Sequence, residues 1–193
     1  MTTDASDAAL ARSAAEGDDK AFAELVRRHK ESLYRLLRRY TGDSDEAYEA
    51  AHEAFIAAWS ALKRYDPNRS FGAWLRTIAI NKARDRGRRM LVRRVFFGSK
   101  DLEDSEVLEK ADPEPGAEHQ VLEAEQARRL DRAVSRLPAA LKEALVLTAF
   151  EGLSQLEAAE TLGVSVKTVE TRVYRARKLL IDQLEPDMRP NAR

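Results

Sequence analysis

The sequence predicts an all-α fold of two small helical domains joined by a flexible linker, with a helix-turn-helix in the C-terminal domain. Apolar residues recur at helical spacing along both halves of the 193-residue chain. A run rich in acidic residues, Pro and Gly separates the halves, and no segment shows the sustained alternation typical of β-strands. We expect domains at residues 1–92 and 121–185, an acidic linker at 93–120 and a disordered tail at 186–193.

Four helices are expected in the N-terminal domain, each bounded by residues that favour helix ends. They cover residues 8–16, 18–41, 44–63 and 70–89. Gly17 and Gly42 end the first two. Because Asp66, Pro67 and Asn68 disfavour helix, we expect a loop at residues 64–69 before Ser70 caps the fourth helix.

Helices resume in the C-terminal domain, at residues 121–137 and 139–150, with Pro138 between them. No internal repeat is visible. The segment that follows directly is the helix-turn-helix, so this domain is expected to hold about four helices.

The helix-turn-helix is predicted from its end signals. Ser154 and Glu157 can close a capping box, Gly163 supplies the turn, and Ser165 can cap the second helix. The apolar face expected for the first helix is Leu156, Ala159 and Leu162. The apolar stripe expected for the second helix is Val169, Val173, Ala176 and Leu180.

This stripe leaves polar and basic residues on the rest of the second helix. They are Lys167, Thr168, Glu170, Thr171, Tyr174, Arg175 and Lys178. In a helix-turn-helix the second helix lies in the major groove, and positive charge near its C-terminal half meets phosphates. DNA binding is therefore the leading hypothesis. An ordinary helical hairpin with a solvated outer face has the same periodicity and stays open as the alternative.

Composition excludes several classes of protein. The chain has no cysteine, which excludes disulfides, thiolate metal sites and thiol redox sensing. We see no signal peptide and no apolar window long enough for a membrane span, and we expect a soluble cytoplasmic protein without membrane insertion. The 33 basic and 33 acidic residues cancel but are segregated. Charged residues within 76–94 are basic apart from Asp85, whereas those within 101–125 are acidic apart from Lys110.

Two long stretches of the sequence resemble one known family. Residues 22–89, from FAELVRRHK to DRGRR, resemble the promoter-melting domain of bacterial sigma factors of the extracytoplasmic-function group. Residues 137–180, from LPAALKEAL to ARKLL, resemble the second DNA-binding domain of the same group. The two stretches cover most of the chain in the right order. The resemblance implies a subunit that binds core RNA polymerase and directs it to promoters with particular −10 and −35 elements.

The resemblance also implies site residues. The stretch DEAYEAAHEAF at residues 45–55 is similar to the polymerase-binding helix, and His52 stands where the family usually has Gln. The polymerase-binding set is then Glu46, Glu49, His52 and Glu53. The set that would take the melted −10 strand is Lys63, Arg64, Asn68, Arg69, Asn81, Lys82, Arg84 and Arg88. An unstacked base needs a shaped pocket with hydrogen-bonding groups, while cations hold the backbone.

In the C-terminal domain, the polar residues of the second helix match the −35 readers of the family, and Glu170 occupies a place that is often basic. A carboxylate there can accept from a cytosine amino group or adjust its neighbours. Arg172 and Arg177 have an equally good structural interpretation as ion-pair partners of Glu157 or Glu160.

Two further features allow more than one interpretation. Phe71 and Trp74, spaced helically with Ile78, are expected in the core, although aromatic rings near Tyr65 could also meet a base. The acidic linker is either a disordered tether or, as the resemblance implies, a strand that mimics nucleic acid in a positively charged polymerase channel. Residues 91–97 are apolar enough to dock on the polymerase or an inhibitor.

Other function classes are weaker. Glu49 and His52 form one Glu-x-x-His half of a di-metal bundle, but a second half is missing, so no metal is expected. No catalytic constellation or cofactor motif is visible, and the protein is not expected to be an enzyme. The rival is a stand-alone dimeric helix-turn-helix regulator. The partners expected are core RNA polymerase, promoter DNA and an anti-sigma factor, with a monomer when free.

Overall fold

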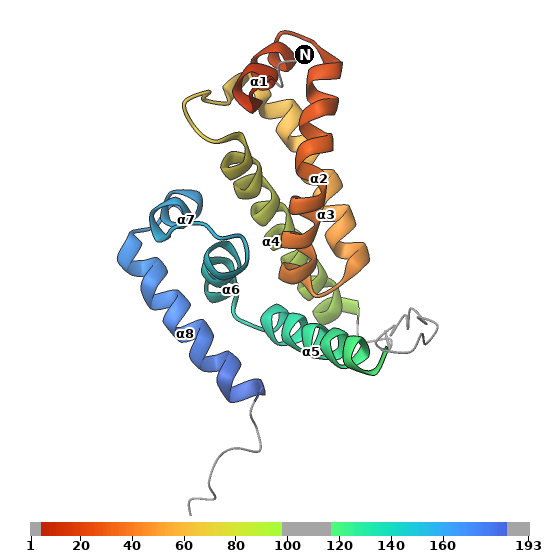
Figure 1. Ribbon diagram of the computed structural model, residues 1–193, viewed down its shortest axis with the longest axis vertical. Helices are drawn as coiled ribbons and strands as arrows, with labels where there is room; N and C mark the ends of the chain where they lie inside the picture. Colours follow the sequence, from red (N-terminus) through yellow and green to blue (C-terminus); the bar gives the residue numbers. More distant parts are fainter. Residues whose placement is uncertain (1–4, 98–116, 185–193) are drawn as a thin grey trace, which may run out of the picture.

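The computed structural model describes residues 5–97 and 117–184. Within these ranges every regular element is helical (Figure 1), so the predicted all-α fold is confirmed. The elements are α1 (Asp7–Ala15), α2 (Asp19–Thr41), α3 (Ser44–Ala61), the short turn η1 (Leu62–Arg64), α4 (Phe71–Phe97), α5 (Ala117–Ser135), α6 (Ala139–Leu145), the π-helical turn η2 (Val146–Phe150), α7 (Gln155–Leu162) and α8 (Val166–Leu184). None of the described helices is long and apolar enough to cross a membrane.

Local side chains set the ends of α2 as the sequence predicts. The Asp18 carboxylate accepts hydrogen bonds from the backbone amides of Lys20 and Ala21, at 2.9 and 3.2 Å. The helix ends at Gly42, whose φ of 78° lies in the left-handed region that favours glycine.

Helices α1 to α4 pack into one bundle around a core that includes Leu25, Leu36, Phe71 and Leu75. The inner face of α3 is lined by alanines, all of them buried, which allow close approach of α2 and α4. They are Ala47, Ala50, Ala51, Ala54 and Ala58. The acidic side chains of α3 are thereby left at the surface.

Helices α5 to α8 form the C-terminal unit, in which α6 and α7 pack on α8. The predicted stripe of α8 is confirmed, because all four of its residues are buried. The predicted capping box between Ser154 and Glu157 is also present, and Gly163 has a φ of 65°. The two-helix geometry of the predicted helix-turn-helix is thus observed.

The apolar face predicted for α7 is wrong in one position. Leu156 is 61% exposed, whereas Ala159 is buried as predicted and Leu162 is half-buried. The helix also buries Ala158 and Thr161. This two-turn helix is contacted by α4 and α6 as well as by α8. Its buried face is therefore set by three neighbours, which the local spacing of leucines does not reveal.

Helix extends into the predicted linker from both sides. Helix α4 continues to Phe97 and α5 begins at Ala117, whereas residues 91–119 lack amphipathic periodicity. Apolar periodicity reports which residues are buried, and a helix can continue where this pattern is absent from the sequence. Residues 98–116 of the linker predicted at 93–120 lie outside the described residues, and so does the tail predicted at 186–193.

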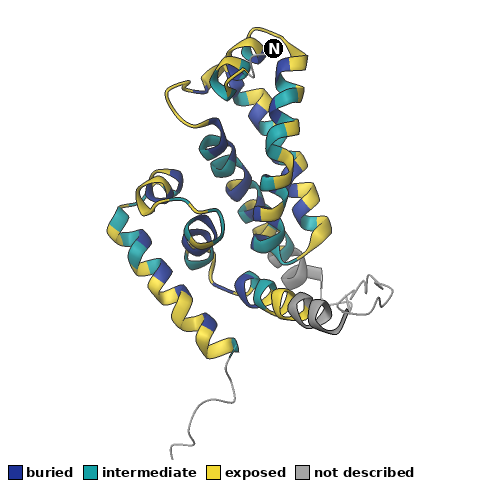
Figure 2. Cartoon of the chain, in the orientation of Figure 1, coloured by how far each residue is buried: buried dark blue, intermediate teal, exposed yellow. Residues whose placement is uncertain are grey.

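The C-terminal unit lies along one side of the N-terminal bundle, with α5 against α2 and α7 beside α4 (Figure 1). We call this contact region between the two units the seam; α4 and α6, which lie on its two sides, both carry buried residues (Figure 2). The approach is very close at Gly42, where a Cβ atom would lie only 2.6 Å from both Cβ and Oγ of Ser135.

Candidate nucleic-acid interface

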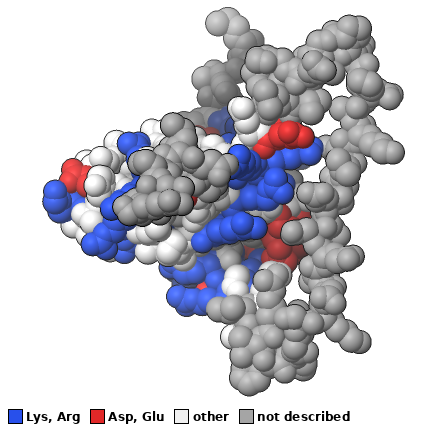
Figure 3. All heavy atoms as spheres, turned by 90° about the horizontal axis from the view of Figure 1, so that it is seen from below, with Lys and Arg blue, Asp and Glu red and all other residues white. Residues whose placement is uncertain are grey.

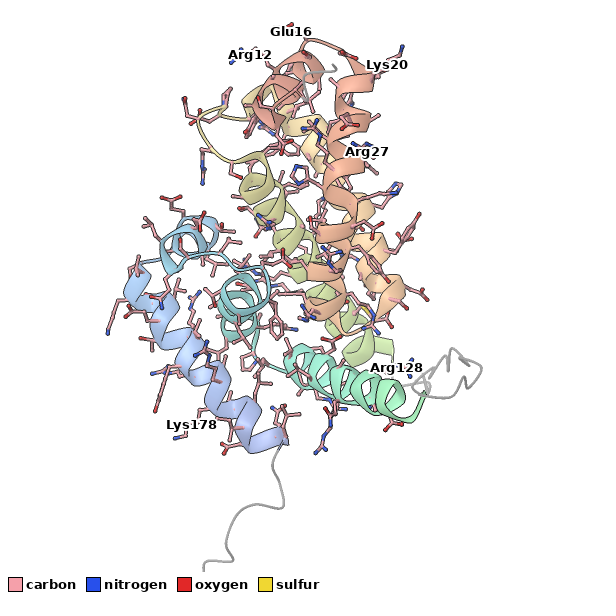
Figure 4. All side chains as sticks on the ribbon, viewed as in Figure 1. Arg12, Glu16, Lys20, Arg27, Arg128 and Lys178 are labelled. Carbon is pink, nitrogen blue, oxygen red and sulfur yellow. The ribbon has the colours of Figure 1, made fainter. Side chains whose placement is uncertain are left out.

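The face of α8 opposite its buried stripe is polar and open to solvent. None of the seven residues predicted there is buried, and Tyr174 is 70% exposed. Lys178 points outward from the last turns of the helix (Figure 4). Lys167 and Glu170 form an ion pair of 3.3 Å, so they partly cancel each other. Arg175 and Lys178 have no ion-pair partner among the described residues, and their charge is available to a ligand.

The structural interpretation of Arg172 and Arg177 is not supported. In the part of the chain that the structure describes, neither Arg172 nor Arg177 forms an ion pair with Glu157 or Glu160. Glu157 instead accepts from Ser154, through its amide at 2.8 Å and its hydroxyl at 2.7 Å, and these bonds hold the pKa of Glu157 below its ordinary value.

A second surface lies on α4 and the loop before it. A cavity of about 330 Å³ is lined on the bundle side by Arg69, Trp74, Thr77, Ile80, Asn81 and Arg84. Arg69, Asn81 and Arg84 belong to the predicted −10 set, and all three line this cavity. They lie within 15 positions of one another in the sequence. The cavity combines an aromatic ring, an amide and two guanidinium groups. These are the groups that hold an unstacked base and its phosphates.

The loop at residues 65–70 is fixed by its own hydrogen bonds. The Tyr65 hydroxyl donates to the Arg69 carbonyl, and the Asn68 amide and side chain both donate to Asp66 at 3.0 Å. The Tyr65 ring packs against Phe71 and Trp74. The predicted core role is confirmed for Phe71, whereas Trp74 is half-buried and reaches the cavity.

The other members of the predicted −10 set do not line the cavity. Lys63, Arg64, Asn68 and Arg88 are exposed and Lys82 is half-buried. Lys63 and Arg64 lie in η1, and Lys82 and Arg88 lie further along α4. These cations come before and after the cavity-lining residues in the sequence, and their positive charge could hold the phosphates of a DNA strand.

The far wall of the cavity comes from the other unit, at residues 160–163 of the helix-turn-helix. Arg84 also reaches across: its guanidinium pairs with Glu143 of α6 at 2.8 Å. The sequence analysis missed Glu143. The only local signal is a carboxylate inside the apolar run ALKEAL, and its partner lies 59 residues earlier in the chain.

The predicted polymerase-binding residues of α3 fall into two groups. Glu46 and Glu53 both accept from Arg86 of α4, at 2.9 and 2.7 Å. Partial burial alone would raise the pKa of Glu53, but Arg86 outweighs it and holds that pKa below its ordinary value. Glu49 and His52 are exposed and lack a described partner. Glu49 and His52 are therefore the members of this set available to another protein.

No group of three potential metal ligands exists within the described part of the chain. Seen from below Figure 1, Lys and Arg outnumber Asp and Glu among the coloured side chains (Figure 3). A helix-turn-helix in one unit and a cavity with Arg side chains on the helical bundle of the other are typical of a DNA-binding protein.

Comparisons with known proteins give the family. Sigma-70 region 2 matches residues 25–91, and Sigma-70, region 4 matches residues 127–180. RNA polymerase sigma factor NccH of Alcaligenes xylosoxydans xylosoxydans is 40% identical over 96% of this chain and 98% of its own. CnrH of Cupriavidus metallidurans is 40% identical over 97% of this chain and 98% of its own. ECF RNA polymerase sigma-E factor of Escherichia coli is 30% identical over 98% of this chain and its whole length.

Solved structures agree. CnrH in complex with the cytosolic domain of CnrY has a TM-score of 0.67 and 34% identity, covering 94% of this chain and 98% of that one. RpoE of Bartonella quintana, in complex with the anti-sigma factor NepR, shares the fold with a TM-score of 0.62 at 23% identity, over 87% of this chain and 99% of that one. The chain therefore belongs to the extracytoplasmic-function (ECF) group of RNA polymerase sigma factors, which are transcription initiation factors and not enzymes. The alternative of a stand-alone regulator leaves the match at residues 25–91 unexplained.

Proposed function

We propose that this sigma factor directs core RNA polymerase to its promoters through three surfaces with separate tasks. The exposed face of α8 reads the −35 duplex. The cavity on α4 and the loop at residues 65–70 take the melted −10 strand. The outer face of α3 binds the polymerase.

The observation that carries the −10 assignment is the cavity itself. It joins Trp74, Asn81 and Arg84 at one opening, with Arg69 from the preceding loop. An aromatic ring can stack on a base, an amide can bond its edge, and guanidinium groups can hold phosphates. The loop is stiffened by Tyr65 and Asp66, so a base would meet a formed pocket at low ordering cost.

The −35 assignment rests on the division of α8 into a buried and an exposed face. The buried stripe fixes the rotation of the helix, so Tyr174, Arg175 and Lys178 must point away from α6. With Lys167 paired to Glu170, Arg175 and Lys178 are the cations left for DNA phosphates.

Of the four predicted polymerase-binding residues, Glu49 and His52 contact the polymerase directly. Glu46 and Glu53 support this surface indirectly, because both are paired with Arg86. Tyr48 and Ile56 are exposed on the same helix, at 65% and 55%. Large apolar side chains beside an acidic residue are typical of a protein contact.

We also propose that an anti-sigma factor binds this chain and blocks one or more of these surfaces. Support comes from the likeness to CnrH over nearly the whole chain, because CnrH was solved with the cytosolic domain of CnrY.

Run-off transcription tests the proposal. Purified core RNA polymerase is assayed with and without this protein on a pooled library of randomised promoter fragments. Selective transcripts that require the protein, lost in Asn81→Ala and kept in the exposed control Arg12→Ala, are the expected result. Tight dimeric binding to duplex DNA with no dependence on polymerase would contradict it.

A further inference from the structure

A buried carboxylate joins the two units of the protein. Glu143 of α6 is only 3% exposed. It accepts from one edge of the Arg84 guanidinium, at 2.9 Å from Nε and 2.8 Å from Nη2, and from the Tyr40 hydroxyl at 3.2 Å. A carboxylate removed from water this completely is stable as an anion only with such partners.

The network draws on three helices from both units. Tyr40 lies at the end of α2, Arg84 on α4 and Glu143 on α6. The neighbouring Lys142 donates to the Tyr40 carbonyl at 3.0 Å and to the Ser135 carbonyl at 2.7 Å, with its ammonium 4.5 Å from the centre of the Tyr40 ring. Burial, together with the charge of Glu143, raises the pKa of Tyr40, so its hydroxyl keeps the proton that it donates.

Other contacts lie along the same seam. Arg39 of α2 pairs with Asp131 of α5 at 3.1 Å and lies over the Phe150 ring. Arg76 of α4 pairs with Glu151 at 3.4 Å. The seam is therefore held along its length by basic residues of the N-terminal unit and acidic residues of the C-terminal unit.

This arrangement occupies the surface that the melted strand would need. Glu143 occupies the Nε and Nη2 atoms of Arg84, and a phosphate at the remaining Nη1 atom would meet the negative charge of this carboxylate, so the two anions compete for one guanidinium. Residues 160–163 form the far wall of the cavity that contains Asn81. The Glu143 carboxylate of the C-terminal unit thus binds Arg84 in the way that a DNA phosphate would bind it.

We infer that Glu143 is an intramolecular competitor of the −10 strand, and that the Glu143–Arg84–Tyr40 contact keeps the Arg84 guanidinium of the free protein from the strand. The inference rests on the proposed strand-binding role of Arg84 and Asn81. Separation of the units frees Arg84 for the strand and exposes Glu143 to water. Because an ion pair gains back hydration when it separates, such a contact can open without a prohibitive cost.

The test uses the full chain, which has no cysteine of its own, so that introduced cysteines are the only labelling sites. Lys20→Cys and Ile181→Cys add two exposed labelling sites, one in each unit, for a fluorescence energy-transfer pair. Glu143→Gln is introduced into this background, and Glu125→Gln, an exposed site on α5, is the matched control for the loss of one negative charge. A fluorescein-labelled pool of short single-stranded DNA is titrated into the unlabelled versions of the same proteins, without polymerase.

Glu143→Gln should lower the energy transfer and tighten single-strand binding by about 5-fold to 150-fold, the usual range for coupling between two sites. Glu125→Gln should change neither. Equal energy transfer and equal strand affinity in Glu143→Gln and the parent would overturn the inference. A fall in energy transfer with no gain in strand affinity would show that the contact closes the units without competing for the strand, and would overturn it as well.

Two further measurements separate the causes of failure. Circular dichroism reports whether Glu143→Gln folds, and Tyr40→Phe, which removes one hydrogen bond and keeps the ring, should show the same changes to a smaller extent. If no variant binds single strands, and Asn81→Ala leaves polymerase-dependent transcription intact, the proposed strand site is wrong. If Asn81→Ala abolishes transcription while Glu143→Gln leaves strand binding unchanged, only the competition is wrong.

Discussion

Arg86 of α4 forms a bidentate pair with Glu46 of α3: its Nε and Nη2 atoms donate to the two carboxylate oxygens at 2.9 and 3.1 Å. The third nitrogen donates to Glu53 at 2.7 Å. One guanidinium therefore ties the helix proposed to bind polymerase to the helix proposed to take the melted strand. This contact gives Glu46 and Glu53 a structural task inside the protein.

Arg86→Gln should lower the free energy of unfolding by about 1.5 kcal/mol, the low end for hydrogen bonds to charged groups, because all three side chains keep some exposure to water. Chemical denaturation followed by circular dichroism measures the change. The control is Arg89→Gln, whose side chain is 63% exposed and 3.6 Å from Glu53. Equal losses for both variants would mean that the bidentate geometry contributes nothing.

The same cluster predicts a pH dependence. The pKa of Glu53 is held below its ordinary value of 4.5, so its contribution to stability is fully present above that pH and is lost as the pH falls through the lowered pKa. The difference in unfolding free energy between the parent and Arg86→Gln should be constant from neutral pH to about pH 5 and shrink below 4.5. A difference that grows on acidification has the wrong sign for this cause.

Substitutions on the two DNA surfaces should separate duplex contact from melting. Arg175→Ala should weaken holoenzyme binding to the upstream duplex by about 1 kcal/mol and reduce its salt dependence, as expected for one lost phosphate contact. Asn81→Ala and Arg84→Ala should slow open-complex formation with a smaller effect on duplex contact. Filter binding and permanganate footprinting measure the two steps, and equal losses in both assays for all three variants would contradict the division of tasks.

The capping box of α7 should be needed for the stability of the helix-turn-helix. Ser154→Ala removes the side chain that accepts from the Glu157 amide at 3.2 Å, and helix caps of this kind contribute about 1 kcal/mol. Thermal unfolding measures the loss. Gln155→Ala, at the next and exposed position, is the control and should change the midpoint little.

Sequence reasoning succeeded where a feature depends on neighbours in the chain. Asp18 and Gly42 bound α2, and Ser154 and Gly163 bound α7, because caps and left-handed turns act over a few residues. The predicted end of the fourth helix, at residue 89, is too early, because the prediction relied on apolar periodicity and α4 continues to Phe97 where the sequence lacks it. The partners of Glu143 and the second wall of the cavity depend on how two units pack, which no local pattern encodes.

Mutation of Gly42 can change the contact between the two units in only one direction. Only a hydrogen atom fits where a Cβ would meet Ser135, and the positive φ also disfavours any side chain. Since no residue is smaller than glycine, substitution at this position can only push α2 and α5 apart and cannot tighten them. A genetic selection for variants with raised basal transcription should therefore return this position, although Gly42 is not among the residues proposed to contact DNA or polymerase.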